Sequence, residues 1–534
     1  MAVTQGVSLI GFRRANAGER TFHGVNPATG EKLSPAYHVA SREDIDAACT
    51  LAQEAFATFS RVSGRKRAEF LREIAKRIEA IGPALVETAM RETALPAPRL
   101  QGETGRTCGQ LRLFAQVLEE GSWVEARIDT SDPNRKPAAK PDLRSMYRPL
   151  GPVVVFGASN FPLAFSVAGG DTASAFAAGN PVIVKAHPAH PATSELVGQA
   201  IVEAVRACGL PEGTFSLIFD DGIDAGAALV QHRLVRAVGF TGSTRGGRAL
   251  MDLAAARPEP IPVYAEMGST NPVFVLPGAA RERGQQIAEG LHGSVTLGAG
   301  QFCTKPGLVM LGADEVAQPV ASKLRELVAA SPESVLLTNG IRSTFRGGVE
   351  ARTKRGSATL LAEGATDPKA DGYRVSTALF ETNLANLEKD SHLAEELFGP
   401  STLLVRYSGR EELLKAARNL EGHLTATVHA TEQDLRDFAD LFAILETKVG
   451  RVILNGYPTG VEVAHAMVHG GPYPATSDGR STSVGTQAIY RFARLVCYQG
   501  FGDSLLPEEL QNGNPLGIWR MVDGAITREA IKGK

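Results

Sequence analysis

Between residues 152 and 268, short apolar runs alternate with stretches in which apolar residues recur every three or four positions. The stretch 194–209 places its apolar residues on one helical face, and Ser194 is predicted to cap that helix. Strands that alternate with helices predict βαβ units, and hence a parallel sheet covered by helices on both faces. The runs predicted to be buried strands are 153–156, 181–184, 215–219, 237–240 and 262–264.

Outside that region the pattern is less regular. A 3.6-residue period over 67–92 predicts an amphipathic helix, and the polar, proline-rich segment 130–142 predicts an exposed connection. A further helix is predicted near 432–446. Two α/β lobes account for this pattern most simply. Strands in the second half of the chain are predicted at 402–405, 425–430 and 451–454.

The composition is that of an ordinary globular protein. Of the 534 residues, 43% are hydrophobic and 21% are charged, which argues against a disordered or fibrous chain. The net charge of −2 gives no basic footprint for nucleic acid. The five cysteines form no CxxC pair, the N-terminus lacks the order of a signal peptide, and no run of 18 apolar residues occurs. We therefore expect a reduced, cytoplasmic protein that does not enter a membrane.

Standard motifs for phosphate or metal binding are absent. There is no Walker A loop, and the nearest approach to GxGxxG, at 298–303, has Cys303 in place of the last glycine. His465 and His469 have the spacing of a zinc helix, but Ala466 replaces the glutamate of HExxH. Prolines around His187 and His190 prevent a helix that presents both rings together. No metal is predicted.

The most informative segment surrounds Cys303. Glycines before it let the backbone approach a substrate, and Lys305 adds positive potential that favours a thiolate. Glu266 and Asn160 each follow a predicted strand, where a base and an oxyanion donor are well placed. Taken singly, each of these residues also fits a structural role: a buried cysteine, a surface glutamate and a turn-forming asparagine.

Seven motifs in order change this picture, because together they resemble the aldehyde dehydrogenase superfamily. The resemblance runs from about residue 20 to 500, with Ser269-Thr270 where many relatives have Gly-Lys. The motifs are NPATGE at 26–31, SNFP at 159–162, VK at 184–185, FTGST at 240–244, EMGSTNP at 266–272, GQFC at 300–303 and ELFGP at 396–400.

The resemblance implies a fold and a domain division. It implies a doubly wound, Rossmann-like cofactor domain, an α/β catalytic domain that bears Cys303, and a small bridging sheet through which family members pair as dimers or as dimers of dimers. The expected boundaries are 1–129 with 151–265 for the cofactor domain, 266–476 for the catalytic domain, 130–150 with 485–502 for the sheet, and 503–534 for a C-terminal tail.

It also implies the chemistry. Cys303 attacks the aldehyde carbon, and Asn160 with the Cys303 backbone N–H holds the oxyanion. Hydride passes to a nicotinamide, a thioester remains on Cys303, and Glu266 activates the water that releases the acid.

The cofactor residues follow from the same motifs. Lys185 contacts the adenosine ribose, Glu396 the nicotinamide ribose, and Phe398 packs beside the ring. Gly242 and Ser243 open a helix whose N-terminus suits a pyrophosphate, and Gly247 permits close packing. Many NAD-preferring relatives carry Glu three positions after this lysine. Because Pro188 stands there, with His187 and Arg245 as neighbours for a 2′-phosphate, we expect NADP to be accepted alongside or in preference to NAD.

Other stretches resemble the 2-oxoglutarate semialdehyde (2,5-dioxopentanoate) dehydrogenases, with the NADP-using fatty aldehyde dehydrogenases as a related group. These stretches are 185–190, 460–478, 482–486 and 514–519. By alignment, a helix after Asn160 presents Phe165, Ser166 and Ala168 to the pocket. Arg106 and Arg112 are candidates for the substrate carboxylate, because a guanidinium matches two oxygens.

Three alternatives remain open at this point. One is a long-chain fatty aldehyde substrate, which an apolar pocket without a functional arginine favours. Another is cysteine acyl transfer or ester hydrolysis without redox chemistry, which leaves the cofactor motifs without a purpose. The third is a catalytically silent relative, against which the joint presence of Cys303, Glu266 and Asn160 argues.

Overall fold

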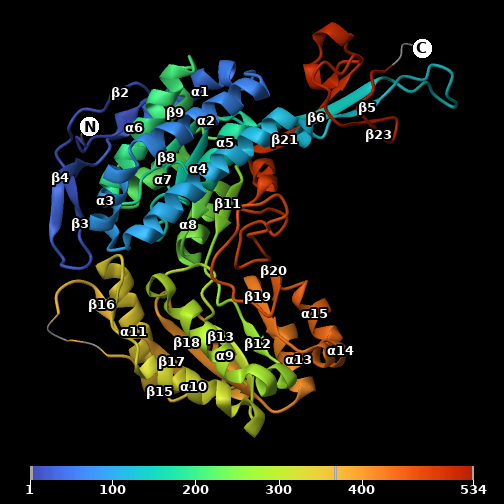
Figure 1. Cartoon of the computed structure of the whole chain (residues 1–534). Coiled ribbons are helices and arrows are strands. Elements are labelled where there is room, and N and C mark those ends of the chain that lie inside the picture. Colours follow the sequence, from blue (N-terminus) through green and yellow to red (C-terminus); the bar gives the residue numbers. More distant parts are fainter. Residues whose placement is uncertain (1–3, 366, 368–369, 532–534) are drawn as a thin grey trace.

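The first lobe is built on a seven-stranded sheet in the order β11-β10-β7-β8-β9-β1-β2 (Figure 1). The five strands from β11 to β9 in this order are parallel, while β1 runs antiparallel to β9 and β2. The computed structural model describes residues 4–365, 367 and 370–531. The strands are β1 (Leu9–Ile10), β2 (Arg13–Arg14), β7 (Val153–Phe156), β8 (Val182–Lys185), β9 (Phe215–Ile218), β10 (Ala237–Thr241) and β11 (Val263–Glu266).

Alternate residues of these strands face two different helical layers. Val153 and Val155 pack in the large core that α2, α4, α5 and α6 cover, whereas Val154 and Ile183 pack under α1 and α7 on the opposite face. Helices on both faces of a parallel sheet confirm the predicted doubly wound α/β class. The helices are α1 (Arg42–Phe59), α2 (Gly64–Ala80), α3 (Gly82–Thr93), α4 (Ala97–Glu120), α5 (Gly170–Ala178), α6 (Pro191–Ala207), α7 (Asp224–Gln231) and α8 (Thr244–Ala255).

Three local predictions in this lobe are wrong. The stretch 67–92 is two helices, α2 and α3, because Gly82-Pro83 interrupts the backbone hydrogen bonding after Ile81. Helix α6 begins at Pro191, whose missing N–H is tolerated at a first helical position, so Ser194 lies inside the first turn and donates back to the His190 carbonyl. Residues 161–169 form turns rather than a helix, and Phe165, Ser166 and Ala168 lie in them.

The second lobe has its own sheet, in the order β15-β17-β18-β13-β12-β19-β20, parallel except for β15. Helices α9 and α10 cover one face, and α12, α13 and α15 cover the other. The helix predicted near 432–446 is broken at Phe438 into two. The strands are β12 (Val273–Val275), β13 (Leu308–Gly312), β15 (Thr359–Glu363), β17 (Ala378–Asn383), β18 (Ser401–Tyr407), β19 (His423–His429) and β20 (Val449–Leu454). The helices are α9 (Pro277–Thr296), α10 (Gln318–Ala329), α11 (Asn339–Arg355), α12 (Leu384–Lys389), α13 (Arg410–Asn419), α14 (Glu432–Asp437) and α15 (Ala439–Leu445).

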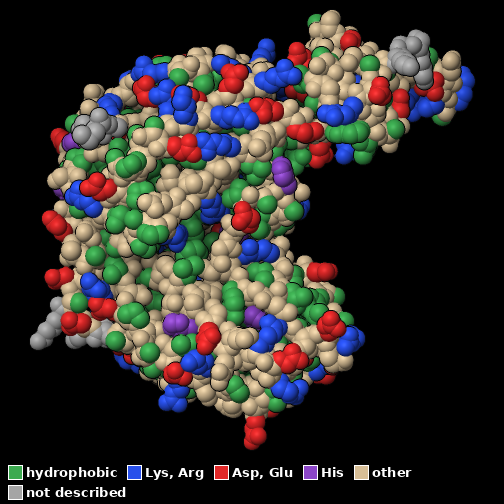
Figure 2. Space-filling model, viewed as in Figure 1, with side chains coloured by type: hydrophobic (Ala, Val, Ile, Leu, Met, Phe, Trp, Pro, Cys, Tyr) green, Lys and Arg blue, Asp and Glu red, His purple; other side chains and the backbone are tan. Residues whose placement is uncertain are grey.

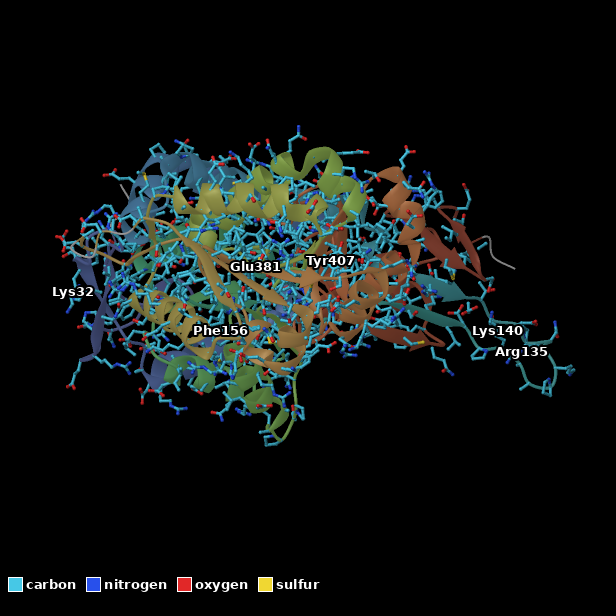
Figure 3. All side chains as sticks on the ribbon, turned by 90° about the horizontal axis from the view of Figure 1, so that it is seen from below. Lys32, Arg135, Lys140, Phe156, Glu381 and Tyr407 are labelled. Carbon is cyan, nitrogen blue, oxygen red and sulfur yellow. The ribbon has the colours of Figure 1, made fainter. Side chains whose placement is uncertain are left out.

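A third sheet forms an arm that projects from the body, with Arg135 and Lys140 in the loop at its end (Figures 1 and 3). The surface is hollowed between this arm and the second lobe (Figure 2). The strand order of the sheet in the arm is β21-β6-β5-β22-β23, so residues after 503 add two strands to it. The strands are β5 (Arg127–Asp129), β6 (Leu143–Pro149), β21 (Ala493–Gln499), β22 (Arg520–Val522) and β23 (Ala525–Thr527).

Two small sheets complete the structure, β3 (Thr21–Val25) with β4 (Lys32–His38) and β14 (Ser334–Val335) with β16 (Arg374–Val375). Residues 1–3 and 532–534, at the ends of the first and last predicted units, lie outside the described residues. Within the described ranges, no helix combines the length and the apolar character needed to cross a membrane.

Candidate active site

Cys303 lies at the end of a tightly wound loop between the two lobes' sheets. Gly298, Ala299 and Gly300 all have left-handed backbone angles, with φ between 57° and 66°. A Cβ on Gly300 would lie 2.3 Å from the Gly399 carbonyl carbon, so only glycine fits there. The glycines therefore bring the Cys303 loop against the segment that carries Glu396 and Phe398.

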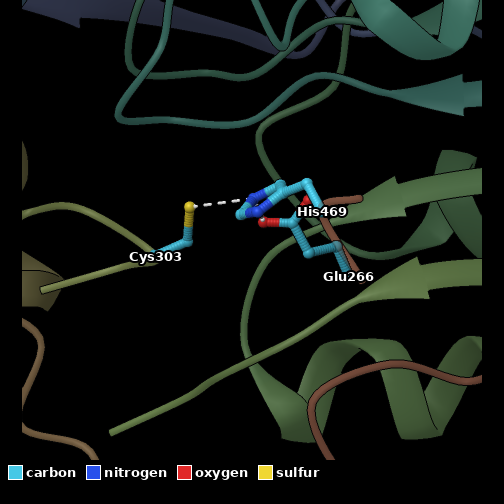
Figure 4. A group of neighbouring side chains, drawn as sticks. All are labelled: Glu266, Cys303 and His469. Carbon is cyan, nitrogen blue, oxygen red and sulfur yellow. Dashed lines mark hydrogen bonds and ion pairs between the residues drawn. The ribbon is translucent and has the colours of Figure 1, made fainter. Parts of the chain in front are cut away.

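A buried histidine joins Cys303 to Glu266 (Figure 4). The His469 Nε2 atom lies 2.8 Å from Glu266 Oε1 and 3.4 Å from Cys303 Sγ. Glu266 is 3% exposed and His469 1% exposed, so bulk water has little access to the pair. Because Nε2 carries only one hydrogen, it cannot donate fully to both neighbours, and the thiol, imidazole and carboxylate form one coupled group.

The sheet edge explains how Glu266 and His469 meet. Glu266 is the last residue of β11, an edge strand, and forms a β-bridge with Thr476. The Met267 N–H also donates to the Ala475 carbonyl, so the segment after His469 runs beside the end of β11. Ser483, on the returning part of the same segment, donates to Glu266 Oε2 at 2.5 Å.

The surroundings set opposite protonation preferences for the two acids. Burial raises the pKa of Cys303 well above its ordinary value, and the charge of Glu266 raises it further. Burial also acts to raise the pKa of Glu266, but His469, Ser483 and Cys303 outweigh this effect and the net pKa is lowered. At neutral pH this arrangement favours a protonated thiol beside an ionised carboxylate, which is a nucleophile next to its base.

Two asparagines hold the same loop. Asn160 Nδ2 donates to the Gln301 carbonyl at 2.9 Å, so its amide lies beside the residues that precede Cys303. Asn271 Nδ2 donates to the carbonyls of Cys303 and Lys305 at 2.8 and 3.0 Å. Asn271 itself has a left-handed φ of 45°, which asparagine tolerates better than most residues.

The positive charge of Arg106 acts against the raised pKa of Cys303 but does not outweigh burial and the charge of Glu266. From the sequence, Lys305 is expected to favour a thiolate at Cys303. Its ammonium instead donates to the carbonyls of Leu397 and Ser401 at 3.0 and 2.9 Å. Lys305 therefore faces the segment of Glu396 rather than the thiol.

An aromatic wall lies next to Cys303, formed by Phe161, Phe165 and Phe302. The rings of Phe161 and Phe302 meet edge to face at 5.2 Å. Arg106 on α4 lies 4.9 Å above the Phe165 ring, and its Nε and Nη2 atoms are buried with no hydrogen-bond partner among the described residues. A buried guanidinium with unfilled donors beside a nucleophile is suited to an anionic group.

Arg106 and Arg112 line one cavity of about 460 Å³ together with Gln116, Val461 and Val463. Arg112 differs from Arg106 in its partners. Both of its Nη atoms donate to Glu79 at 2.6 Å, in an exposed ion pair. The Arg112 charge is thus already matched, whereas the buried donors of Arg106 are not.

The predicted cofactor residues cluster at the carboxyl ends of the first sheet and in the facing segment. Lys185 ends β8, and its ammonium donates to the Asp220 carbonyl at 2.9 Å. Glu396 is held against the 268–269 backbone, and its Oε1 atom is buried without a partner in the part of the chain that the structure describes. Phe398 is half-buried in the same segment.

The start of α8 is open and partly exposed. Ser243 is its N-cap and accepts from the Gly246 N–H, and Gly242 precedes it. A Cβ on Gly247 would lie 2.6 Å from Met267 Sδ, so this glycine lets α8 pack closely on the end of β11. His187 stacks on His190 at 5.6 Å in a loop rather than a helix, and burial lowers its pKa well below the ordinary value.

Sequence reasoning missed the role of His469. The sequence pattern pairs His469 only with His465, but 464–467 form a turn, His465 is exposed and His469 is buried. Glu266 and His469 are separated by 203 residues, and no local pattern links them. Glu103 was also missed: its buried carboxylate accepts the N–H groups of Leu163 and Ala164, which fixes the turns after Asn160.

Comparison with known proteins agrees with this geometry. An alpha-ketoglutaric semialdehyde dehydrogenase of Azospirillum brasilense is 49% identical over 521 residues, 97% of this chain and 99% of that protein. A second enzyme of the same name, from Acinetobacter baylyi, is 44% identical and covers 99% of this chain and 100% of its own length.

Among solved structures, the NAD+ complex of an aldehyde dehydrogenase from Bacillus cereus superposes with a TM-score of 0.79 over 93% of this chain and 96% of that one, at 22% identity. The sequence profile of the aldehyde dehydrogenase family matches residues 12–490. The fold, the grouping of Cys303 with Glu266 and these matches lead to one conclusion: the chain belongs to the aldehyde dehydrogenase family.

Proposed function

We propose that this aldehyde dehydrogenase oxidises 2,5-dioxopentanoate, the semialdehyde of 2-oxoglutarate, to 2-oxoglutarate. The names of the two relatives at 49% and 44% identity support this substrate. The structural observation that carries it is the guanidinium of Arg106, whose buried donors lack partners among the described residues beside the candidate nucleophile. The aromatic wall alone would suit an apolar chain, but an apolar chain leaves those donors unfilled.

Cys303 is the proposed nucleophile. Its Sγ forms a bond to the aldehyde carbon while the thiol proton passes to Glu266, whose carboxylate is ionised in this environment. One amide hydrogen of Asn160 is used by the Gln301 carbonyl, and the second is available, with the Cys303 backbone N–H, for the oxyanion of the thiohemiacetal.

Glu266 is also the proposed base for the second half of the reaction. Once Glu266 has released the thiol proton to solvent, a water attacks the thioester carbon and its proton goes to Glu266, while the Cys303 sulfur leaves as a thiolate. His469 positions the carboxylate through its 2.8 Å contact, and Ser483 holds the other oxygen.

The residues present fit a nicotinamide cofactor. The unpartnered, buried Oε1 of Glu396 is an acceptor for ribose hydroxyls, Lys185 has further N–H donors for the adenosine ribose, and the start of α8 suits a pyrophosphate. When bound, NAD(P)+ supplies the hydride acceptor that converts the thiohemiacetal into the thioester. We propose that NADP is accepted, since Pro188 stands where a repelling carboxylate would otherwise lie and Arg245 is exposed near the start of α8.

We also propose that two copies of the chain pair through the arm. Strand β21 is an edge strand, and exposed apolar side chains of the arm include Leu495, Phe501 and Ile526. An exposed edge with apolar side chains favours pairing with another strand.

Replacing the nucleophile tests the chemistry. We expect Cys303→Ala to lower kcat for 2,5-dioxopentanoate by roughly 1,000-fold or more, because no other group there forms the thioester. The measurement is NAD(P)H formation followed at 340 nm. The exposed cysteine provides the control, and Cys497→Ser should retain the wild-type rate. Full activity of Cys303→Ala would rule out the mechanism.

Arg106 tests the substrate. Arg106→Leu should reduce kcat/KM for 2,5-dioxopentanoate by about 10–100-fold, the value of a charged hydrogen bond, while the rate with decanal is kept. Arg112→Leu is the matched control, since its guanidinium is paired with Glu79. Equal losses on both aldehydes would instead assign Arg106 a structural role.

Arg245 tests the cofactor. In Arg245→Ala we expect kcat/KM for NADP to fall about tenfold and that for NAD to stay constant, because only NADP carries the 2′-phosphate. Arg248→Ala, also on α8 but paired with Asp252, should change neither. A wild-type enzyme without measurable NADP activity would refute the assignment.

Light scattering tests the assembly. The expected mass is twice or four times that of one chain, and Leu495→Lys on β21 should shift it toward the single chain. Ile526→Lys on β23, at the opposite edge of the sheet, is the control. Dissociation by the control variant alone would move the interface to the other edge.

A further inference from the structure

Three different metal-ligand types converge at the active site. Among the described residues, one ligand atom each from Glu266, Cys303 and His469 all lie within 4.8 Å of one another. Figure 4 shows the three side chains pointing toward a common centre from separate segments of the chain. No metal is predicted from the sequence, because Ala466 replaces the glutamate of an HExxH motif between His465 and His469. In the structure, the neighbours of His469 are instead Glu266 and Cys303.

The sulfur–nitrogen distance is close to that around a tetrahedral zinc ion, and the nitrogen–oxygen distance is shorter. Zinc bonds of about 2.3 Å to sulfur and 2.0–2.1 Å to nitrogen place the two ligand atoms about 3.6 Å apart in tetrahedral geometry. The Cys303 Sγ to His469 Nε2 distance is 3.4 Å. The Nε2 to Glu266 Oε1 distance of 2.8 Å requires an opening of about half an ångström to accept the ion.

The charges also match. A thiolate, a carboxylate and a neutral imidazole neutralise a divalent cation, which offsets the cost of burying it. Three protein ligands leave a fourth position for water, as in zinc sites that exchange their ligands. Ser483 already fixes the second oxygen of Glu266.

Two features limit the affinity. The Nδ1 atom of His469 is buried without a partner in the described chain, so a zinc-bound imidazole lacks the usual second hydrogen bond. The guanidinium of Arg106 acts on both Cys303 and Glu266 and opposes an added positive charge. Both features favour a reversible site over a permanent structural one.

We propose that Cys303, Glu266 and His469 form a reversible binding site for Zn²⁺, and that zinc bound there stops aldehyde oxidation. On binding, the Cys303 S–H proton is released to solvent and a sulfur–zinc bond forms, with no change of oxidation state. The sulfur is then unable to attack an aldehyde, and Glu266 is unable to accept a proton. The inhibition of aldehyde oxidation, unlike zinc binding itself, rests on the proposed function.

Cobalt reports on the site independently of catalysis. The metal-free full-length enzyme is titrated with Co²⁺, which, unlike zinc, absorbs light when bound by thiolate. We expect a thiolate-to-cobalt charge-transfer band that saturates at one ion per chain and disappears when Zn²⁺ is added. Cys303→Ser should abolish the band, and His469→Gln should weaken binding by about tenfold or more.

Matched variants separate this site from general thiol binding. Cys497→Ser removes the exposed cysteine and His465→Gln the exposed neighbour, and both should bind cobalt as the wild type does. Glu266→Gln keeps the side-chain shape and replaces His469→Gln as the ligand test if that variant does not fold. Absence of the band in the wild type, or wild-type affinity in both ligand variants, would overturn the proposal.

Inhibition is measured separately. Zn²⁺ should abolish NAD(P)H formation at the concentration at which it displaces cobalt, and EDTA should restore it. If zinc displaced cobalt but did not inhibit an active enzyme, the proposed inhibition by zinc would be overturned. A cobalt band in an enzyme that oxidises no aldehyde would instead refute the proposed function and leave the metal site in place.

Discussion

A carboxylate as deeply buried as Glu266 is stable only if hydrogen-bond donors surround it, and this requirement organises the centre of the molecule. Its hydrogen-bond partners His469, Ser483 and Cys303 all lie outside the sheet that carries Glu266. Both His469 and Ser483 arrive on a segment that leaves the second lobe and folds back along the edge of the first sheet. The two lobes are therefore joined at the point where the thiol of Cys303 lies.

The same constraint explains what the sequence could and could not predict. The five parallel strands of the first sheet were recognisable as short apolar runs, and the position of Glu266 at the end of β11 followed from that pattern. The two-residue strands β1 and β2 were not predicted, since β2 consists of two arginines and neither strand is long enough to show a period. The contact of Glu266 with His469 was not recognisable, because 203 residues separate them and His469 lies in an irregular segment without periodicity. Proline effects account for two errors: Pro83 divides one predicted helix, and Pro191 starts another before the predicted cap.

The substrate side of the site combines two surfaces that usually exclude each other. The rings of Phe161, Phe165 and Phe302 form a dry wall, yet Arg99 and Arg106 lie against those rings. Stacking on an aromatic face lowers the cost of burying a guanidinium, because the ring partly replaces lost hydration. A short acid with an aldehyde at its other end matches such a surface better than a purely apolar chain does.

The arm sets the order in which the molecule is completed. Its strand β6 pairs with β21, and Thr130 donates to Asp523 across 393 residues of sequence. During synthesis β5 and β6 emerge long before β21 and β22, so within the described sheet they pair only with each other until residues 493–522 have been made. Unpaired edges of this kind are where chains associate wrongly, so the pairing of β6 with β21 and of β5 with β22 shields the two earlier strands from such contacts.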